Sequence, residues 1–353
     1  MWPMVQKEVR ELRRDRRTVA MLIGLPLILL VVFGYAANFD VSEVRTAVYG
    51  DGAETVAEQL PDLFVIDTVD PDGDESTAQQ ELVDGNADVA IATGATTTAF
   101  VDGSSLFTAQ TAAAALAQAP GSITVDILFN PDLKTSWVMV PALVGLIMAF
   151  IGTLITSLGL VRERQAGTIE QLAVMPFRPS DVIVGKIAPY FVLAYLDMIV
   201  VTVLGALLFG VPFQGSVVLF GVGAAVFLLA VLGLGVLIST VSQNQGQAVQ
   251  TAMFVMLPQI LLSGMIFPLE SMPWGVRWIG YVLPLTYFVD LSGGIMLRGA
   301  GLPALWIPFA VLAVMAVLIL GAAILRFRRD LAPDTGEPPS GDDGTAAEHA
   351  ATA

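Results

Sequence analysis

Hydrophobic residues along this chain gather in long runs that are separated by shorter polar stretches. Six of these runs occupy residues 18–37, 137–161, 187–210, 217–241, 247–267 and 304–325. Each reaches the length of about 20 residues that a helix needs to cross the hydrocarbon core of a bilayer. The pattern predicts an α-helical polytopic membrane protein with six transmembrane helices.

A polar stretch of different periodicity, residues 38–136, separates the first two runs. Segments with strand character occur at residues 45–51, 63–70, 87–94 and 122–130, and segments with helical character at residues 52–60, 76–85 and 105–118. Such alternation is typical of an α/β fold, and a segment of this length commonly folds independently. We therefore expect a small α/β domain inserted after the first transmembrane helix. We interpret its many acidic residues as a solvated surface, and the alternative is that they capture cations.

Composition narrows the class of protein. The chain is 55% hydrophobic and 14% charged, whereas soluble domains carry about 25% charged residues. It has no cysteine, which excludes disulfides, thiolate metal sites and cysteine nucleophiles. The single histidine, His349, lies in a polar segment beyond the last run, which argues against histidine-based catalysis. A soluble enzyme is not expected, and no catalytic or metal site is predicted.

The basic residues indicate the orientation in the membrane. Of 17 lysines and arginines, 13 fall before the first run, between the second and third runs, or after the sixth. The positive-inside rule places these segments, and with them both termini, in the cytoplasm of a multi-pass cell-membrane protein. Residues 38–136 contain only Arg45 and Lys134 as basic residues and are expected outside. Residues 326–353 read as a basic and then disordered tail.

The cytoplasmic loop between the second and third runs, residues 162–186, contains a possible short helix. Thr168 and Gln171 form the T-x-x-Q pattern of a capping box, and Pro176 would end the helix. This pattern alone fits both an ordinary capped loop on the lipid headgroups and an element that docks on a partner protein.

Polar residues inside the runs suggest a path through the membrane. Asp197 would lie about 15 Å from either end of its helix, at a depth where a charge normally faces a bundle interior or a cavity. It is either part of a substrate path or subunit interface, or a buried structural acid. Gln259 and Ser263 follow Pro258, which frees a backbone carbonyl, and we place both in the path.

Several motifs resemble those of the permease subunits of ABC-2 type exporters, in the bacterial drug-exporter branch that has an ectodomain after the first span. The resemblance extends to about residue 330. Its strongest part is "ERQAGTIEQLAVMPFRPSDVIVGKIAPY", and "LGLGVLISTVSQNQGQAVQ" and "LPQILLSGMIFPLESMPWGVRWIGYVLPLTYF" match later segments in the same order.

The resemblance implies roles for several segments. The loop would carry a coupling helix that docks on a separate ATPase, with the motif residues Glu163, Gly167, Thr168, Glu170, Leu172, Pro176 and Lys186. Residues 1–17 would form an interfacial elbow helix. Residues 268–303, interrupted by prolines, would form an extracellular re-entrant segment that closes the outer end of the path, with Pro268, Pro273 and Trp274 at this outer gate.

The chain carries no nucleotide site of its own. The sequence nearest to G-x-x-x-x-G-K-[ST] is "SDVIVGKI", which has Ser180 in place of the first glycine and Ile187 in place of the last residue. No cofactor is therefore expected on this chain, and ATP and magnesium would be held by the partner ATPase.

The function expected from these features is ATP-driven export of a hydrophobic or amphipathic compound, such as a drug or lipid, by alternating access. Expected partners are cytosolic ABC ATPase subunits, an identical or sibling permease that completes a dimer, and membrane lipids, but not nucleic acid. Two alternatives stay open: a proton- or ion-coupled transporter that uses Asp197 without an ATPase, and a membrane scaffold that acts through its ectodomain.

Overall fold

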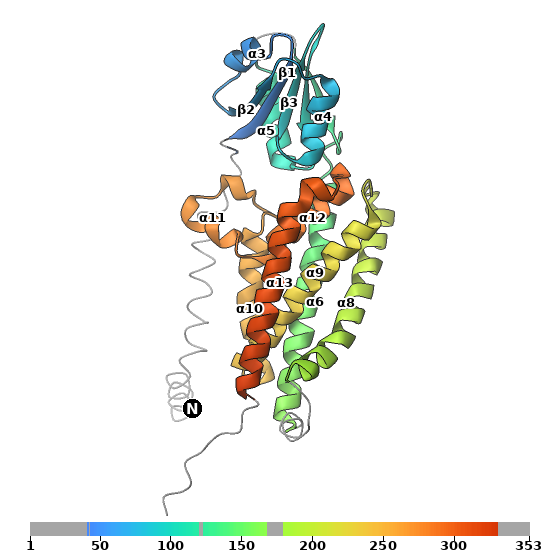
Figure 1. Cartoon of the computed structure of the whole chain (residues 1–353), viewed down its shortest axis with the longest axis vertical. Helices are drawn as coiled ribbons and strands as arrows, with labels where there is room; N and C mark the ends of the chain where they lie inside the picture. The colour runs from blue at the N-terminus through green and yellow to red at the C-terminus, as the bar shows by residue number, and fades with distance from the viewer. Residues whose placement is uncertain (1–40, 42, 120–122, 168–178, 331–353) are drawn as a thin grey trace, which may run out of the picture.

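The structure, a computed structural model, describes residue 41 and residues 43–119, 123–167 and 179–330. An α/β domain lies at one end of a bundle of long helices (Figure 1). The predicted elbow helix (1–17), first span (18–37) and disordered tail lie outside the described residues.

The α/β domain is built on one five-stranded sheet. Its strands are β1 (Val44–Gly50), β2 (Phe64–Asp70), β3 (Val89–Thr93), β4 (Thr97–Asp102) and β5 (Ile123–Leu128), in the order β2-β1-β3-β4-β5. Neighbouring strands are parallel except for the antiparallel pair of β3 and β4. The small α/β domain expected from the sequence is thus confirmed, but the prediction missed β4.

Helices cover both faces of this sheet. They are α3 (Ala53–Gln59), α4 (Glu75–Asp84) and α5 (Leu106–Leu116). Side chains alternate between the faces of a strand, so Val48 packs in the core with α3 and α5, while Tyr49 packs in the core beneath α4. The helix α4 therefore lies alone on its face, with Ala78 and Leu82 buried.

Five long helices form the bundle: α6 (Thr135–Gln165), α8 (Pro179–Phe209), α9 (Val217–Val241), α10 (Gln245–Leu262) and α13 (Leu302–Asp330). Within the described residues, four segments are long and apolar enough to cross a membrane: Thr135–Gln165, Ile187–Phe209, Val217–Val241 and Leu302–Phe327. The helix α10, at the expected fifth span, has 18 residues and begins with three glutamines among its first six residues. It packs along α6 within the bundle (Figure 1).

The helices on either side of the loop at residues 162–186 are longer than expected. The sequence placed a loop at residues 162–186, but α6 continues to Gln165 and α8 begins at Pro179. Proline is well suited to the first position of a helix, because its missing amide hydrogen is not needed there. Only residues 166–178 separate the two helices, and of these the structure describes Ala166 and Gly167.

The segment between α10 and α13 folds into a bent pair of helices. A short 3₁₀ turn, η1 (Leu269–Ser271), precedes α11 (Trp274–Gly280), and α12 (Pro284–Gly293) continues directly into a π-helix, η2 (Gly294–Arg298). The pair is bent by 77° at the break between the two helices. Two hydrogen bonds span this bend, from Thr286 Oγ1 to the Gly280 carbonyl at 2.6 Å and from the Tyr287 hydroxyl to the Tyr281 carbonyl at 2.7 Å.

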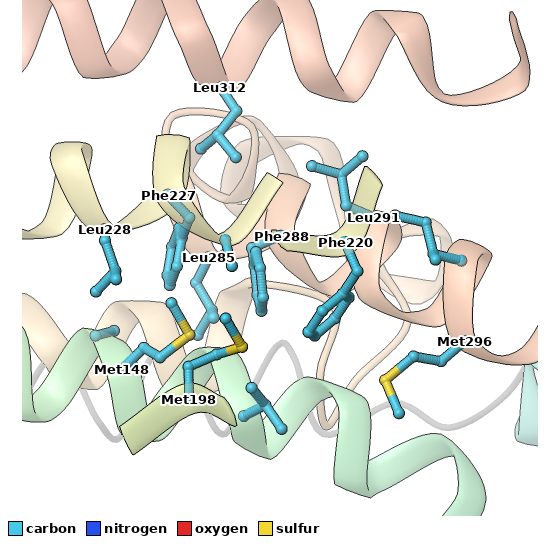
Figure 2. Packing of buried hydrophobic residues seen from close by; sticks show 14 of the residues in the cluster. Met148, Met198, Phe220, Phe227, Leu228, Leu285, Phe288, Leu291, Met296 and Leu312 are labelled. Carbon is cyan, nitrogen blue, oxygen red and sulfur yellow. The ribbon is translucent and has the colours of Figure 1, made fainter. Parts of the chain in front are cut away.

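Side chains of α12 lie among buried side chains of α6, α9 and α13 (Figure 2). The ring of Phe288 stacks on that of Phe227 from α9, with 4.6 Å between the ring centroids. Gly145 of α6 faces Phe288 and Leu285 so closely that a side chain at residue 145 would collide with them. Because cores of this density transmit displacement rather than absorb it, a shift of α12 will move α6 and α9.

Candidate transport path and its two ends

At the end of α9 beside the last turn of α6, hydroxyl side chains bond to backbone carbonyl groups. The last four carbonyl groups of a helix, here including that of Ile238, have no partner within the helix and need other donors. Ser239, Thr240 and Ser242 donate to the carbonyls of Val236, Leu237 and Ile238, at 2.6, 2.7 and 2.7 Å.

Arg164, in the last turn of α6, supplies further donors to this helix end. Its Nη1 atom lies 3.0 Å from the Ser239 carbonyl oxygen and 3.3 Å from that of Ser242. A positive charge at a helix C-terminus is also favoured by the helix dipole. Arg164 therefore joins the C-terminal ends of α6 and α9.

The start of α10 is held at the same place. Asn244 caps the helix by accepting a hydrogen bond from the Gln247 amide, and the Gln247 side chain accepts one from the Gln243 amide. The Gln245 side chain donates to the side chain of Gln165 at 3.2 Å. The C-terminal ends of α6 and α9 and the start of α10 are thus joined directly beside the loop that was expected to dock on an ATPase.

The residues expected to couple to an ATPase are only partly described. Glu163 is half-buried in the last turn of α6, and Gly167 follows the helix in the left-handed conformation, with φ of 72°. Lys186 lies within α8. The remaining four lie outside the described residues: Thr168, Glu170, Leu172 and Pro176. Sequence reasoning missed Arg164, although a basic residue in the last turn of a helix is a recognisable signal.

Buried polar side chains lie in the middle of the bundle, on α6 and α10. Gln259 and Ser263 of α10 are buried, and Gln259 Oε1 and Ser263 Oγ have no hydrogen-bond partner among the described residues. The same holds for the hydroxyls of Thr153 and Thr156 on α6. Measured from the Gln165–Gln245 contact, Thr153 and Gln259 lie about 18 and 21 Å along their helices. They are therefore at similar depth on two adjacent helices.

Unpartnered polar atoms of this kind cost free energy in an apolar interior unless water or a ligand binds them. Among the described residues, the side-chain amide of Gln259 contacts the sulfur of Met256, at 4.0 Å, which is a weak acceptor. These four side chains therefore retain unused hydrogen-bonding capacity within the bundle.

Asp197 lies on α8, apart from these residues. It is half-buried at the border between the inward face of the helix, with Ala194 and Met198, and the outward face, with Leu193 and Val200. Within the described part of the chain Asp197 makes no ion pair or hydrogen bond. Its position at the edge of an outward apolar face is compatible with a subunit interface, and the structure does not bring it to Gln259 and Ser263.

The residues expected at the outer gate lie around α11. Pro268 is half-buried, whereas Pro273 and Trp274 are exposed, Trp274 to 79%. The Arg277 side chain donates to the Tyr281 hydroxyl at 2.9 Å. The apolar contacts beneath them are made by Leu262, Phe267 and Met272, which are buried together. Pro273 and Trp274 therefore lie on the outer surface of the bent pair, and the buried layer consists of residues that sequence reasoning did not select.

Comparison with known proteins identifies the family. The model of the ABC-2 family transporter proteins matches residues 16–325. The chain belongs to the ABC-2 transporter family. Two similar proteins from Escherichia coli K12 are the probable multidrug ABC transporter permeases YbhR and YbhS. They are 29% and 28% identical over 93% and 92% of this chain and 98% and 96% of their own lengths. ABC transporter G family member 20 of Dictyostelium discoideum is 28% identical over 58% of this chain and 28% of its own length.

Proposed function

We propose that this chain is the permease subunit of an ABC-2 type exporter that moves a hydrophobic or amphipathic compound out of the cytoplasm. The family match over residues 16–325 carries the proposal. The similarity to two probable multidrug permeases along nearly their whole length supports a drug-like or lipid-like substrate. Energy would come from a separate cytosolic ATPase, since the sequence lacks a phosphate-binding loop.

The joined helix ends explain how an ATPase could act on the membrane part. A partner that displaces the loop between α6 and α8 would pull on α6, and Arg164 would pass that displacement to α9. The Gln165–Gln245 contact and the short turn between α9 and α10 would pass the displacement on to α10 as well. Three helices, including the two with buried polar side chains, would then move together.

In this proposal the chain crosses the membrane six times and holds the α/β domain outside. The first span comes from residues 18–37 and the fifth from α10, while the bent pair is re-entrant. The aromatic side chains of Trp274, Trp278 and Tyr281 are exposed on α11, as expected at a membrane–water boundary. The apolar side chains exposed along α8 and α13 would face lipid or a second permease.

Site-directed crosslinking tests the proposal, because the chain contains no cysteine. We expect Leu172→Cys, in native membranes, to crosslink to a protein that mass spectrometry identifies as an ABC ATPase. Gln110→Cys on α5 is the matched control, and we expect an impermeant thiol reagent to label it from outside without any ATPase crosslink. Free labelling of Leu172→Cys from the outside, or ATPase capture by both variants, would contradict the proposal.

Asp197 motivates a second candidate, a proton-coupled carrier. A half-buried acid within a span, without an ion-pair partner among the described residues, is typical of proton-relay positions. The two candidates differ in their response to Asp197→Asn and to ATP depletion. Transport that survives ATP depletion, follows a proton gradient and is lost in Asp197→Asn would favour the carrier. Transport that stops on ATP depletion, with the gradient intact, favours the exporter.

A further inference from the structure

Arg298 lies at the contact between the α/β domain and the helical bundle. It is the last residue of η2, and its side chain is only 13% exposed. Its Nη1 atom is 3.7 Å from Oδ2 of Asp102, at the end of β4, and its Nη2 atom is 3.3 Å from Oδ1 of Asp290 on α12. One guanidinium thus joins a carboxylate of the domain to a carboxylate of the bundle.

The two carboxylates differ in exposure. The Asp290 side chain is 54% exposed, whereas that of Asp102 is 3% exposed. The other oxygen of Asp102 accepts a hydrogen bond from the Ser104 amide at 2.8 Å. Burial raises the pKa of Asp102, and the charge of Arg298 opposes that rise. A buried carboxylate that loses its cation is strongly destabilising, so the contact with Asp102 is the one that matters energetically.

Two glycines make room for the guanidinium. A Cβ atom on Gly85, the residue that ends α4, would lie 2.7 Å from Arg298 Nη1, and one on Gly294 would lie 3.0 Å from Nη2. One glycine belongs to the α/β domain and the other to η2. We call the space between these two glycines the Arg298 slot. Outside it, α4 also contacts both η2 and α13.

The chain segment between β5 and α6 also attaches the domain to the bundle, and hydrogen bonds hold it in place. Asn130, between β5 and α6, is fully buried. Its side chain donates to the carbonyls of Gly103 and Lys134 and accepts from the Lys134 amide at 2.9 Å. With this connection at one point and Arg298 at another, the domain is prevented from rotating freely on α6.

We propose that Arg298 is a positioning residue that fixes the α/β domain to the α12–η2 segment, so that the domain moves with the outer end of the transport path. The segment is part of the bundle core, because Phe288 of α12 stacks on Phe227 of α9. Opening the outer end by moving α12 therefore carries the domain along. The placement of the domain rests on the geometry at Arg298, and only the link to opening rests on the proposed function.

The test measures the domain's position directly in the full chain reconstituted in nanodiscs. Spin labels at Gln110→Cys, on α5, and Leu302→Cys, at the start of α13, are both on exposed positions. We expect double electron–electron resonance to give a narrow distance distribution for the parent chain and for Arg298→Lys, and a broader, shifted one for Arg298→Met. An unchanged distribution in Arg298→Met would overturn the proposal.

Glu54→Met is the control, since Glu54 is an exposed charged residue in the first turn of α3, on the face of the sheet opposite α4. We expect it to leave the distance distribution unchanged, and broadening equal to that of Arg298→Met would overturn the proposal. If Arg298→Met does not fold, adding Asp102→Asn removes the buried charge. This double variant must then show the broadened distribution, and a narrow one would overturn the proposal. Because no variant is judged by transport, failure here is distinguishable from failure of the proposed function.

Discussion

Two arginines hold the opposite ends of the bundle, and they do so by different chemistry. At the end away from the α/β domain Arg164 donates to the carbonyl oxygens of Ser239 and Ser242, two uncharged acceptors at the end of a neighbouring helix. At the end next to the α/β domain Arg298 contacts two carboxylates, one of which belongs to that domain. The first arginine therefore connects helices of one bundle, and the second connects two separately packed cores.

The difference has consequences for how each contact fails. Removing Arg164 leaves two uncharged carbonyl groups, of the buried residues Ser239 and Ser242, without these donors, at a cost of about 1–3 kcal/mol for each buried group left without a partner. Removing Arg298 leaves the buried Asp102 charge without its partner, which is more costly than the pair itself is favourable. The loss of Arg164 thus leaves neutral groups unpaired within one bundle, whereas the loss of Arg298 leaves a buried charge unpaired between two parts of the chain.

The largest effect on transport is expected from Arg164→Met. The change removes both hydrogen bonds to α9 while keeping the apolar length of the side chain, at a cost of about 1.5–3 kcal/mol in the free energy of unfolding. We expect the Leu172→Cys crosslink to the ATPase to persist while transport in vesicles falls sharply. Arg162→Met, at the exposed neighbouring arginine, is the control that should retain transport. Equal losses in both variants would show that Arg164 has no special connecting role.

The next effect concerns the outer end and uses two glycines with positive φ. Gly85 and Gly52 have φ of 74° and 90°, so alanine at either costs about 1–2 kcal/mol in backbone strain. A Cβ at Gly85 would meet Arg298, whereas one at Gly52 would meet no atom within 4 Å. We expect Gly85→Ala to lower the thermal unfolding midpoint more than Gly52→Ala, and to broaden the Gln110–Leu302 distance distribution as Gly52→Ala does not. Identical behaviour of the two variants would mean that the Arg298 slot is not tightly packed.

The same two ends show what the sequence alone could and could not predict. Hydropathy located the helices of the bundle because crossing a membrane requires long apolar runs, and alternation located four strands of the sheet. The strand β4 was missed because its first residues, Thr97 and Thr98, are only half-buried and follow a short turn that reads as loop. Antiparallel pairing with β3 makes it a strand, and pairing is a property of the fold rather than of the segment.

The candidate site was less predictable than the fold. Polar residues within apolar runs, such as Gln259, are visible in the sequence because they are costly in a membrane. The roles of Arg164 and Arg298 are not visible in the sequence, because both lie at helix ends, where basic residues are common. The partners of Arg164 are 75 or more residues away along the chain. The buried partner of Arg298, Asp102, lies in the α/β domain. Only the packing of separate elements brings these groups together.

A smaller effect is expected at the far end of α4, whose other end contacts Arg298. Asp74 caps this helix, and hydrogen bonds from Ser76 and Thr77 lower its pKa from 3.8 to about 2. A carboxyl with a lowered pKa contributes stability above its ordinary pKa and loses it as the pH falls through the folded value. Asp74→Ala should therefore raise hydrogen exchange of α4 amides in the full chain at pH 5, relative to the parent. At pH 2 we expect the difference to shrink, and a difference independent of pH would contradict the capping role.

The smallest effect is expected from Gln245→Leu. This change compares the neutral contact of Gln245 with Gln165 to the contact that the charged Arg164 makes with α9 at the same end of the bundle. Gln245 and Gln165 are both exposed, and their single hydrogen bond of 3.2 Å competes with water. Such a bond contributes about 1 kcal/mol or less, so transport and the unfolding midpoint should stay close to those of the parent chain. Arg164 and the short turn between α9 and α10 would then hold the three helix ends together without help from Gln245. A loss of transport as large as in Arg164→Met would instead show that α10 must be held separately, and that the charge of Arg164 is not what distinguishes this end of the bundle.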